Sequence, residues 1–387
     1  MKTAKTKLFI EAIPLTRERL HGVAHALLGT VITIASSQDF KRDYEIVLVA
    51  PREGLKQLDR WPELKDCKRI GLPFKTRVFN GLVKYGLLPP MDQILGRGVY
   101  LFGDFKNWPL SRRSLSLTYI HDISFALFSE FVEPKNQKML LKNTPRFIRQ
   151  TDYVIAVSET SKEEIAKYYR FDPKRILVLY NGVDRKLFRP YSSREVAKVK
   201  KKYGITKPYF LYVGNIEPRK NLIRLIEAFD RIPRSYSLVI IGGSGWLDEP
   251  IKAAITKARR RGASIVKPTS YVSDEEIAVL TSGAESFVHP ALHEGFGMDP
   301  VQAMAAGVPT LASDIPVLRE VLGDGAVYFD PRKVDSIADA MTNSLKFTEA
   351  KKARMAKRGM KRSDRYAWEL ATKKLYDFLQ SHQTSVR

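Results

Sequence analysis

The sequence predicts an α/β protein of two doubly wound lobes, on the strength of three observations. Short apolar runs typical of buried strands alternate with amphipathic helical patterns along most of the chain. A turn-rich stretch, residues 180–190, interrupts this alternation near the middle. The length of 387 residues suits two domains, each with its own core.

The first lobe is predicted from six strand-like runs, at residues 8–13, 46–49, 99–102, 115–120, 154–157 and 176–179. Their alternation with helical patterns predicts a parallel sheet with helices on both faces. Gly22 stands where the first loop passes into a helix. A glycine there lets a phosphate or sugar approach the backbone, and a simple turn glycine is the alternative.

The boundary between the lobes is expected near residue 186. Asn181-Gly182 is a turn signal, and Pro190 discourages immediate continuation of a helix. We therefore expect domains at 1–186 and 187–364, followed by a final helical segment at 365–387. In the second lobe, the strand pattern PYFLYVG precedes a helix whose apolar residues share one face.

A strand end, a glycine loop, a helix, a turn and a strand are predicted in this order for residues 289–313, HPALHEGFGMDPVQAMAAGVPTLAS. Asp299 is predicted to cap the helix and to form a capping box with Gln302, and Gly307 with Pro309 ends it. The loop from Glu294 to Gly297 leaves amides uncovered ahead of a helix N-terminus, which favours a polar or anionic ligand.

That stretch resembles the donor-site signature of glycosyltransferase family 4. The same order of motifs continues through the chain in HDISF, AVSETSKEEI, YNGVD, YVGNIEPRKNLIRLIEAF and RYAWELA. The resemblance implies a GT-B fold of two Rossmann-like domains facing a cleft, with a C-terminal helix that crosses back to the first domain. It further implies a retaining transferase that uses a nucleotide diphosphate sugar.

The resemblance assigns catalytic roles to four residues. Arg219 and Lys220, in EPRKN, match the family's diphosphate clamp, and Glu294 would hold hydroxyls of the transferred sugar. His121 follows a predicted strand and would lie on the donor-sugar side of the cleft. Ordinary surface cations and a half-buried histidine are the alternatives.

Nucleotide and donor binding is assigned to a second set of positions. Asn215, after the Gly214 turn, stands where many family members place another arginine, and Gln302 stands in place of a second glutamate. The remaining predicted donor-binding residues are Gly22, Tyr271, Val272, Phe296, Gly297 and Met298.

Metal-independent chemistry is expected. The sequence has no Asp-x-Asp triplet and no His/Cys cluster at metal-ligand spacing. Arg219 and Lys220 would then stabilise the charge of the leaving diphosphate. We expect no cofactor beyond the donor substrate.

The net charge of +23 favours binding of an anionic partner. Because the excess is shared almost evenly between the two halves, nucleic-acid binding is disfavoured. No long apolar run or signal peptide is found, so we expect a cytoplasmic protein. Residues 74–88 mix Lys75, Arg77 and Lys84 with apolar residues at helical spacing, which predicts peripheral contact with the inner face of the cytoplasmic membrane or, alternatively, an ordinary packed helix.

The motif sequences EPRKN and EGFG most resemble those of bacterial polysaccharide mannosyltransferases. We therefore expect transfer of a hexose to a glycan or lipid-linked acceptor, with GDP-mannose as first and dTDP-rhamnose as second donor. The alternatives are an impaired sugar-nucleotide-binding relative, suggested by Gln302, and another GT-B enzyme such as a sugar-nucleotide epimerase or glucan synthase.

Overall fold

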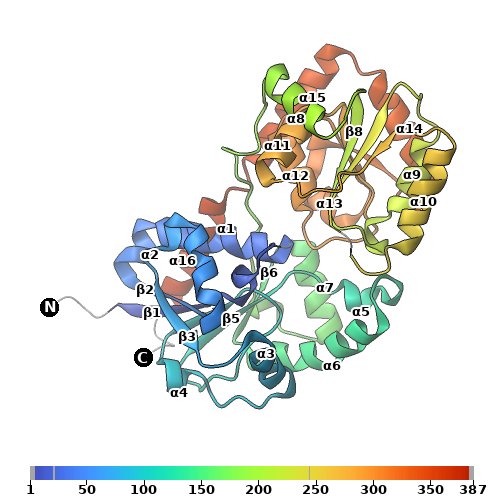
Figure 1. Cartoon of the computed structure of the whole chain (residues 1–387). Coiled ribbons are helices and arrows are strands. Elements are labelled where there is room, and N and C mark those ends of the chain that lie inside the picture. The colour runs from blue at the N-terminus through green and yellow to red at the C-terminus, as the bar shows by residue number, and fades with distance from the viewer. Residues whose placement is uncertain (1–4, 21, 244, 383–387) are drawn as a thin grey trace. The chain divides into compact units, whose positions relative to one another are not determined.

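The computed structural model describes residues 5–20, 22–243 and 245–382. The chain forms two compact units, each built on its own parallel sheet (Figure 1). Unit 1 comprises residues 1–123, 138–182 and 368–387, and unit 2 comprises residues 124–137 and 183–367. Each unit is an α/β layer structure, so the predicted fold class is confirmed.

The sheet of unit 1 has seven parallel strands in the order β3-β2-β1-β4-β5-β6-β7. The strands are β1 Thr6–Glu11, β2 Tyr44–Pro51, β3 Lys68–Leu72, β4 Val99–Phe102, β5 Leu115–Ile120, β6 Tyr153–Ala156 and β7 Ile176–Val178. Six were predicted from their apolar runs. The prediction missed β3, whose sequence KRIGL begins with two charged residues and occupies the sheet edge, where most of its side chains stay partly exposed.

The helices numbered from α1 to α7 lie between β1 and β7 in the chain. They are α1 Gly22–Ser36, α2 Gln38–Asp43, α3 Thr76–Tyr85, α4 Asp92–Leu95, α5 Ser124–Leu127, α6 Pro134–Gln150 and α7 Glu159–Tyr169. Helix α5 and the first turn of α6 belong to unit 2. No helix in the described part of the chain has the length and apolar character needed to cross a bilayer.

The C-terminal helix α16, Trp368–Ser381, returns to unit 1, as predicted. It packs along α1, where Gly29 leaves room for the Trp368 indole; a Cβ at Gly29 would lie 2.2 Å from that ring. Farther along, the Tyr376 hydroxyl accepts a hydrogen bond from Arg42 at 2.6 Å, and its ring packs edge-on against Phe40.

Unit 2 carries a six-stranded parallel sheet in the order β10-β9-β8-β11-β12-β13. The strands are β8 Tyr209–Val213, β9 Ser237–Ile241, β10 Ile265–Val266, β11 Ser286–His289, β12 Thr310–Ser313 and β13 Ala326–Phe329. The helices are α8 Ser193–Lys202, α9 Leu222–Phe229, α10 Glu249–Arg260, α11 Asp274–Ser282, α12 Met298–Ala305, α13 Pro316–Leu322, α14 Val334–Leu345 and α15 Glu349–Ser363.

Alternate residues of β8 face two different cores. Phe210 and Tyr212 pack with α9, α10 and α14, whereas Tyr209, Leu211 and Val213 pack with α11 and α12. Both faces of the strand are therefore buried, which explains its continuous apolar sequence. This central, rigid strand positions the loop that carries the candidate site.

Candidate active site

The loop after β8 begins with a close approach of two backbone segments. The Gly214 N–H donates to the Ile241 carbonyl at 3.0 Å, and the Ile216 N–H donates to the Gly243 carbonyl at 3.0 Å. A Cβ at Gly242 would lie 1.9 Å from the Gly214 oxygen, so only glycine fits there. The loops after β8 and β9 are thus fastened together at the carboxyl edge of the sheet.

A cluster of opposite charges follows, and it joins three of the predicted catalytic residues. Arg219 Nη1 donates to Glu294 Oε2 at 2.9 Å, and Lys220 Nζ donates to Glu294 Oε1 at 2.5 Å. Arg219 and Lys220 lie on a short 3₁₀ turn, Pro218–Lys220, while Glu294 comes from the loop after β11. The structure therefore brings together residues that lie more than 70 positions apart in the sequence.

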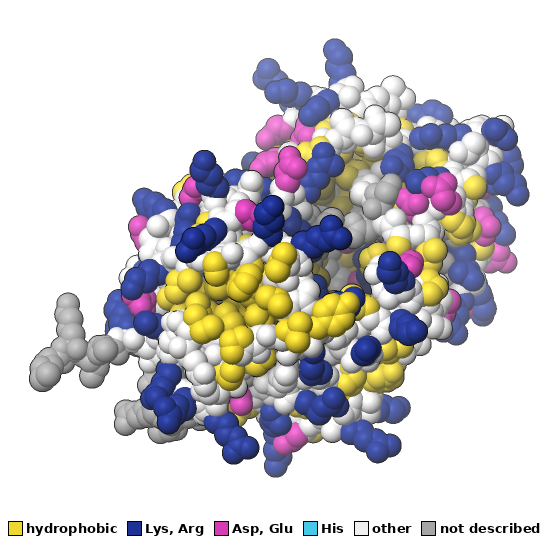
Figure 2. All heavy atoms as spheres, turned by 60° about the horizontal axis from the view of Figure 1, so that its bottom comes forward, with side chains coloured by type: hydrophobic (Ala, Val, Ile, Leu, Met, Phe, Trp, Pro, Cys, Tyr) yellow, Lys and Arg dark blue, Asp and Glu magenta, His cyan; other side chains and the backbone are white. Residues whose placement is uncertain are grey.

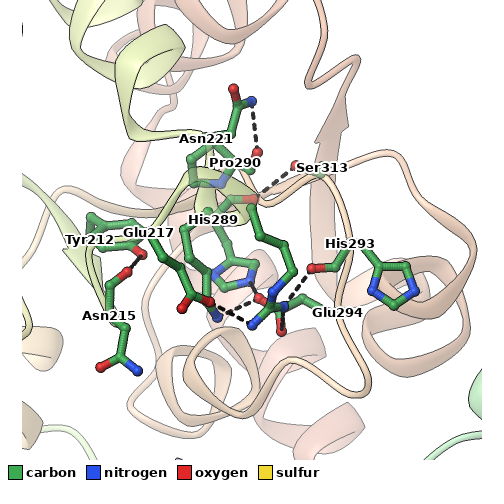
Figure 3. Close-up of polar contacts among 11 residues, drawn as sticks. Tyr212, Asn215, Glu217, Asn221, His289, Pro290, His293, Glu294 and Ser313 are labelled. Carbon is green, nitrogen blue, oxygen red and sulfur yellow. Dashed lines mark hydrogen bonds and ion pairs between the residues drawn. The ribbon is translucent and has the colours of Figure 1, made fainter. Parts of the chain in front are cut away.

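Two further residues complete the cluster and were not predicted. Glu217 accepts from Arg219 Nη2 at 2.8 Å, and His289, which ends β11, lies with its Nε2 3.1 Å from Glu294 Oε1. Figure 3 shows Glu217 and His289 directed toward Glu294 from different elements. His289 is fully buried and Glu217 is 2% exposed, so both belong to the interior of the cluster.

The charge state of Glu294 follows from this arrangement. Burial would raise its pKa, but Lys220 and Arg219, with the hydrogen bond from His289, outweigh burial and hold the pKa well below its usual range. Glu294 is therefore a carboxylate at neutral pH. Without a ligand, the two cations of the cluster are matched by the carboxylates of Glu217 and Glu294.

Asn221 fixes the position of the cation-bearing turn and was not predicted as a site residue. Its backbone is left-handed, at φ 59°, where asparagine is tolerated better than most residues. Its amide donates to the carbonyls of Pro290, at 3.0 Å, and Pro331, at 2.7 Å. The turn after β8 is thereby tied to the loops after β11 and β13.

The glycine loop before α12 differs from the prediction in one respect. Helix α12 starts at Met298, with Gly297 at the N-cap position in a left-handed conformation at φ 88°, and no side chain caps it. The predicted capping box of Asp299 and Gln302 is wrong, because Asp299 already lies in the first turn. Gln302 is half-buried and belongs to the second turn.

Phe296 and Met298 lie on either side of Gly297. Phe296 is 4% exposed and packs edge-on against Tyr366, with ring centroids 5.3 Å apart. Its side chain therefore serves packing, and any ligand contact would come from its backbone. Met298 is half-buried at the first helical position.

Tyr271 and Val272, which were predicted to bind the donor, also lie in unit 2. Strand β10 ends at Val266, and residues 267–272 form the loop that carries both residues. Tyr271 is 63% exposed, whereas Val272 is buried in the core beside α11. Asn215, after Gly214, is exposed, and Figure 3 shows its amide directed away from Glu294.

His121 and Gly22 belong to unit 1. His121 follows β5, and its Nε2 lies 3.0 Å from the Gly103 carbonyl oxygen, so this nitrogen carries the proton. In a neutral ring, Nδ1 is then an acceptor. Gly22 begins α1, and a Cβ there would meet nothing within 4 Å, so close packing does not require glycine at this position.

Unit 1 also contains a buried carboxyl group that was not predicted as a site residue. Glu11 ends β1, is 8% exposed and accepts from the Ile13 N–H at 3.1 Å. Burial, reinforced by the nearby Asp104 carboxylate, raises its pKa to about 8. Since Glu11 pairs with Phe102 in the sheet and Gly103 follows β4, Glu11 and His121 occupy the same carboxyl edge of unit 1.

Between residues 5 and 382, residues 21 and 244 aside, no group of three His, Cys, Asp or Glu side chains could hold a metal ion. The expectation of metal-independent chemistry stays a prediction.

Two family profiles match this chain. Residues 194–362 match the family described as Glycosyl transferases group 1, and residues 107–187 match Glycosyltransferase Family 4. The first match contains the whole charge cluster of unit 2, and the second contains His121.

Among curated proteins, the chain is similar to O-antigen chain mannosyltransferase B of Escherichia coli, with 29% identity over 266 residues, covering 67% of this chain and 69% of that protein. It is 32% identical over 232 residues to O-antigen chain mannosyltransferase RfbU of Salmonella typhimurium, covering 60% of this chain and 61% of RfbU, less than two thirds of its length. Among solved structures, HepE of Anabaena in complex with UDP and glucose aligns with a TM-score of 0.73 and 17% identity, covering 97% of this chain and 100% of HepE.

Proposed function

Because this chain belongs to glycosyltransferase family 4 and has the GT-B fold, we propose that it transfers a hexose, with retention of configuration, from a nucleotide diphosphate sugar to a glycan or lipid-linked acceptor. The charge cluster of Arg219, Lys220 and Glu294 carries this proposal. It joins two cations suited to a diphosphate with a carboxylate suited to sugar hydroxyls.

The cations act on the leaving group in this proposal. The bond between the anomeric carbon and the diphosphate oxygen breaks, and the electron pair stays on the diphosphate. An acceptor hydroxyl forms the new bond to that carbon and gives its proton to the departing diphosphate oxygen. Arg219 and Lys220 stabilise the growing negative charge. Because both side chains are mostly buried and are held by carboxylate partners, they need little reorganisation to do so.

Glu294 has two tasks. It aligns the two cations when no ligand is present, and its depressed pKa keeps it an acceptor for donor-sugar hydroxyls. His289 orients the carboxylate through Oε1. Since Glu217 and Glu294 together balance the charges of Arg219 and Lys220, the diphosphate also needs the amides at the start of α12.

The other predicted residues take supporting roles. Gln302 binds the ribose, the backbone of Tyr271 and Val272 binds the base, and Gly214 and Asn215 line the phosphate path. His121 Nδ1 accepts from a donor-sugar hydroxyl, and Gly22 admits the ligand to the start of α1. The acceptor binds to unit 1, where Glu11 offers a protonated carboxyl group.

GDP-mannose is the first donor candidate and dTDP-rhamnose the second. Support comes from the names of the two curated relatives, both O-antigen mannosyltransferases, which also support a place in surface-polysaccharide synthesis.

Thermal-shift measurements with GDP, UDP, dTDP and their sugar conjugates test the proposal. A ligand at 100 times its dissociation constant should stabilise the protein by about 2.7 kcal/mol. Lys220→Met should reduce this shift, whereas Lys357→Met, on the exposed face of α15, should not. Stabilisation by none of these ligands, together with no release of nucleoside diphosphate from any donor, would contradict the proposal.

A further inference from the structure

Helix α3 of unit 1 displays an apolar stripe that no other described part of the chain is shown to cover. Val78 and Tyr85, seven residues apart and hence on one helix face, are 52% and 68% exposed. Phe74, just before the helix, is 39% exposed, and Leu87, just after it, is 66% exposed. The opposite face is anchored, because Phe79 and Val83 are buried in the core of unit 1.

Cations border this stripe. Arg77 and Lys84 are also seven residues apart, so they share the flank next to Val78 and Tyr85, and Lys84 Nζ lies 5.3 Å from the centre of the Tyr85 ring. Lys75 occupies the N-cap position. Residues 74–88 contain no acid; one neighbouring carboxylate, Glu53, accepts from the Thr76 N–H at 2.8 Å.

The stripe is held in a fixed shape. Arg146, from α6, donates to the carbonyls of Val83, at 2.6 Å, and Lys84, at 3.0 Å, and thereby satisfies the C-terminal end of α3. The Leu87 N–H donates to the Leu82 carbonyl at 2.9 Å. Exposure of Tyr85 and Leu87 therefore belongs to an ordered helix end. Figure 2 shows hydrophobic side chains gathered in one patch on the face of unit 1 that carries α3, with Lys and Arg side chains around it.

We infer that this α3 surface, formed by Phe74, Val78, Tyr85 and Leu87 with Lys75, Arg77 and Lys84, docks on an anionic lipid bilayer. Aromatic and aliphatic side chains enter the boundary between headgroups and acyl chains, while the long cationic side chains reach anionic headgroups at the same depth. The combination of a narrow apolar stripe with cations and no acid of its own fits a lipid surface, whose charge is negative throughout. This inference does not depend on the donor or on catalysis.

Co-sedimentation with vesicles tests the inference with the full-length chain. Wild type should bind vesicles of phosphatidylcholine mixed with phosphatidylglycerol, and binding should fall as salt is raised. Because each near-surface cation contributes about five-fold to partitioning, the triple variant Lys75→Glu, Arg77→Glu, Lys84→Glu should bind more than ten-fold more weakly.

The matched control reverses three exposed cations on α15: Arg354→Glu, Lys357→Glu and Lys361→Glu. It removes the same net charge from unit 2 and should weaken binding much less. A second variant, Val78→Ser, Tyr85→Ser, Leu87→Ser, keeps every charge and should also lose at least about ten-fold, because apolar burial drives part of the binding. Circular dichroism verifies that each variant is folded.

Three results would overturn the inference. They are no binding of wild type to anionic vesicles at low salt, an equal loss in the α15 control, and full binding by the serine variant. Concentration-dependent self-association that the serine variant abolishes, without vesicle binding by wild type, would instead identify the α3 surface as a contact between copies of the chain.

Discussion

Lys220 donates to Glu294 Oε1 at 2.5 Å inside unit 2, with both side chains about nine-tenths buried. Removing one partner of such a pair leaves the other charge buried and uncompensated. Glu294→Ala should therefore lower the free energy of unfolding by about 3–5 kcal/mol, as well as abolish most turnover. Urea denaturation at pH 7 measures the first effect, and donor turnover well below the unfolding temperature measures the second.

Asp314→Asn provides the control for the Glu294 variant. It breaks the ion pair of Asp314 with Arg319, whose side chains are both about half exposed, so stability should change by less than about 1 kcal/mol. Equal losses in the free energy of unfolding would show that the buried ion pairs of Glu294 contribute no more to stability than the exposed pair of Asp314 and Arg319.

Asn221 allows backbone strain to be separated from hydrogen bonding. Both Asn221→Gly and Asn221→Ala remove the hydrogen bonds to Pro290 and Pro331, at roughly 1 kcal/mol each. Alanine also has to adopt the positive φ, at a further cost of about 1–2 kcal/mol, so the glycine variant should be the more stable. Chemical denaturation of both variants checks this order. An alanine variant as stable as the glycine variant would mean that the turn changes conformation.

Glu11 should make the stability of the protein depend on pH. Its pKa is raised from 4.5 to about 8 in the folded state, so the folded chain binds more protons than the unfolded chain between these values. Stability is then highest below pH 4.5, as far as this group is concerned, and falls as pH rises toward 8, by at most about 1.4 kcal/mol per pH unit.

Glu11→Gln removes this dependence and should be more stable than wild type at pH 8, with the difference shrinking toward pH 5. Urea denaturation at three pH values measures it, and Glu227→Gln, at an exposed position of α9, controls for loss of a carboxylate. If the free energy of unfolding of Glu11→Gln changes with pH in the same way as that of wild type, Glu11 is ionised in the folded chain.

Much of the fold could be predicted because its signals are local. Six of the strands of unit 1 are apolar runs buried on both faces, whereas β3 is charged and lies at the edge. The start of α12 was mispredicted for a local reason too: Gly297 takes the N-cap position that Asp299 was expected to occupy.

The charge cluster could be predicted only in part. The motif EPRKN indicated Arg219 and Lys220, and EGFG indicated Glu294, but nothing local shows that Lys220 and His289 share one oxygen of that carboxylate. Asn221 stands within the same motif, yet its partners Pro290 and Pro331 lie 69 and 110 residues away. Such contacts depend on strand order, which the sequence pattern does not specify.

Turnover should survive removal of divalent cations. The sequence has no Asp-x-Asp triplet, and Arg219 and Lys220 stand at the position proposed for the diphosphate. Donor turnover measured after EDTA treatment should equal that of the untreated enzyme within about two-fold, less than 0.5 kcal/mol in the barrier. Loss of turnover with EDTA and its return with Mg²⁺ or Mn²⁺ would show that the two cations are insufficient.

Gln302 stands where the resemblance to glycosyltransferase family 4 implies a second glutamate. In the structure it is half-buried in the second turn of α12, whose N-cap position is taken by Gly297 and not by Asp299. A glutamate would accept charge-assisted hydrogen bonds from both ribose hydroxyls. Glutamine still offers a carbonyl oxygen to one hydroxyl and an N–H donor to the other.

The glutamine also removes a negative charge near the proposed diphosphate, where Glu217 and Glu294 already balance the two cations. This partly offsets the weaker ribose contact. We therefore expect Gln302→Glu to change nucleoside diphosphate affinity by no more than about ten-fold, or roughly 1.4 kcal/mol, in an enzyme that is active as it stands. Calorimetry and steady-state kinetics on both proteins decide the matter: if only Gln302→Glu binds and turns over a donor, the natural chain is an impaired sugar-nucleotide-binding relative.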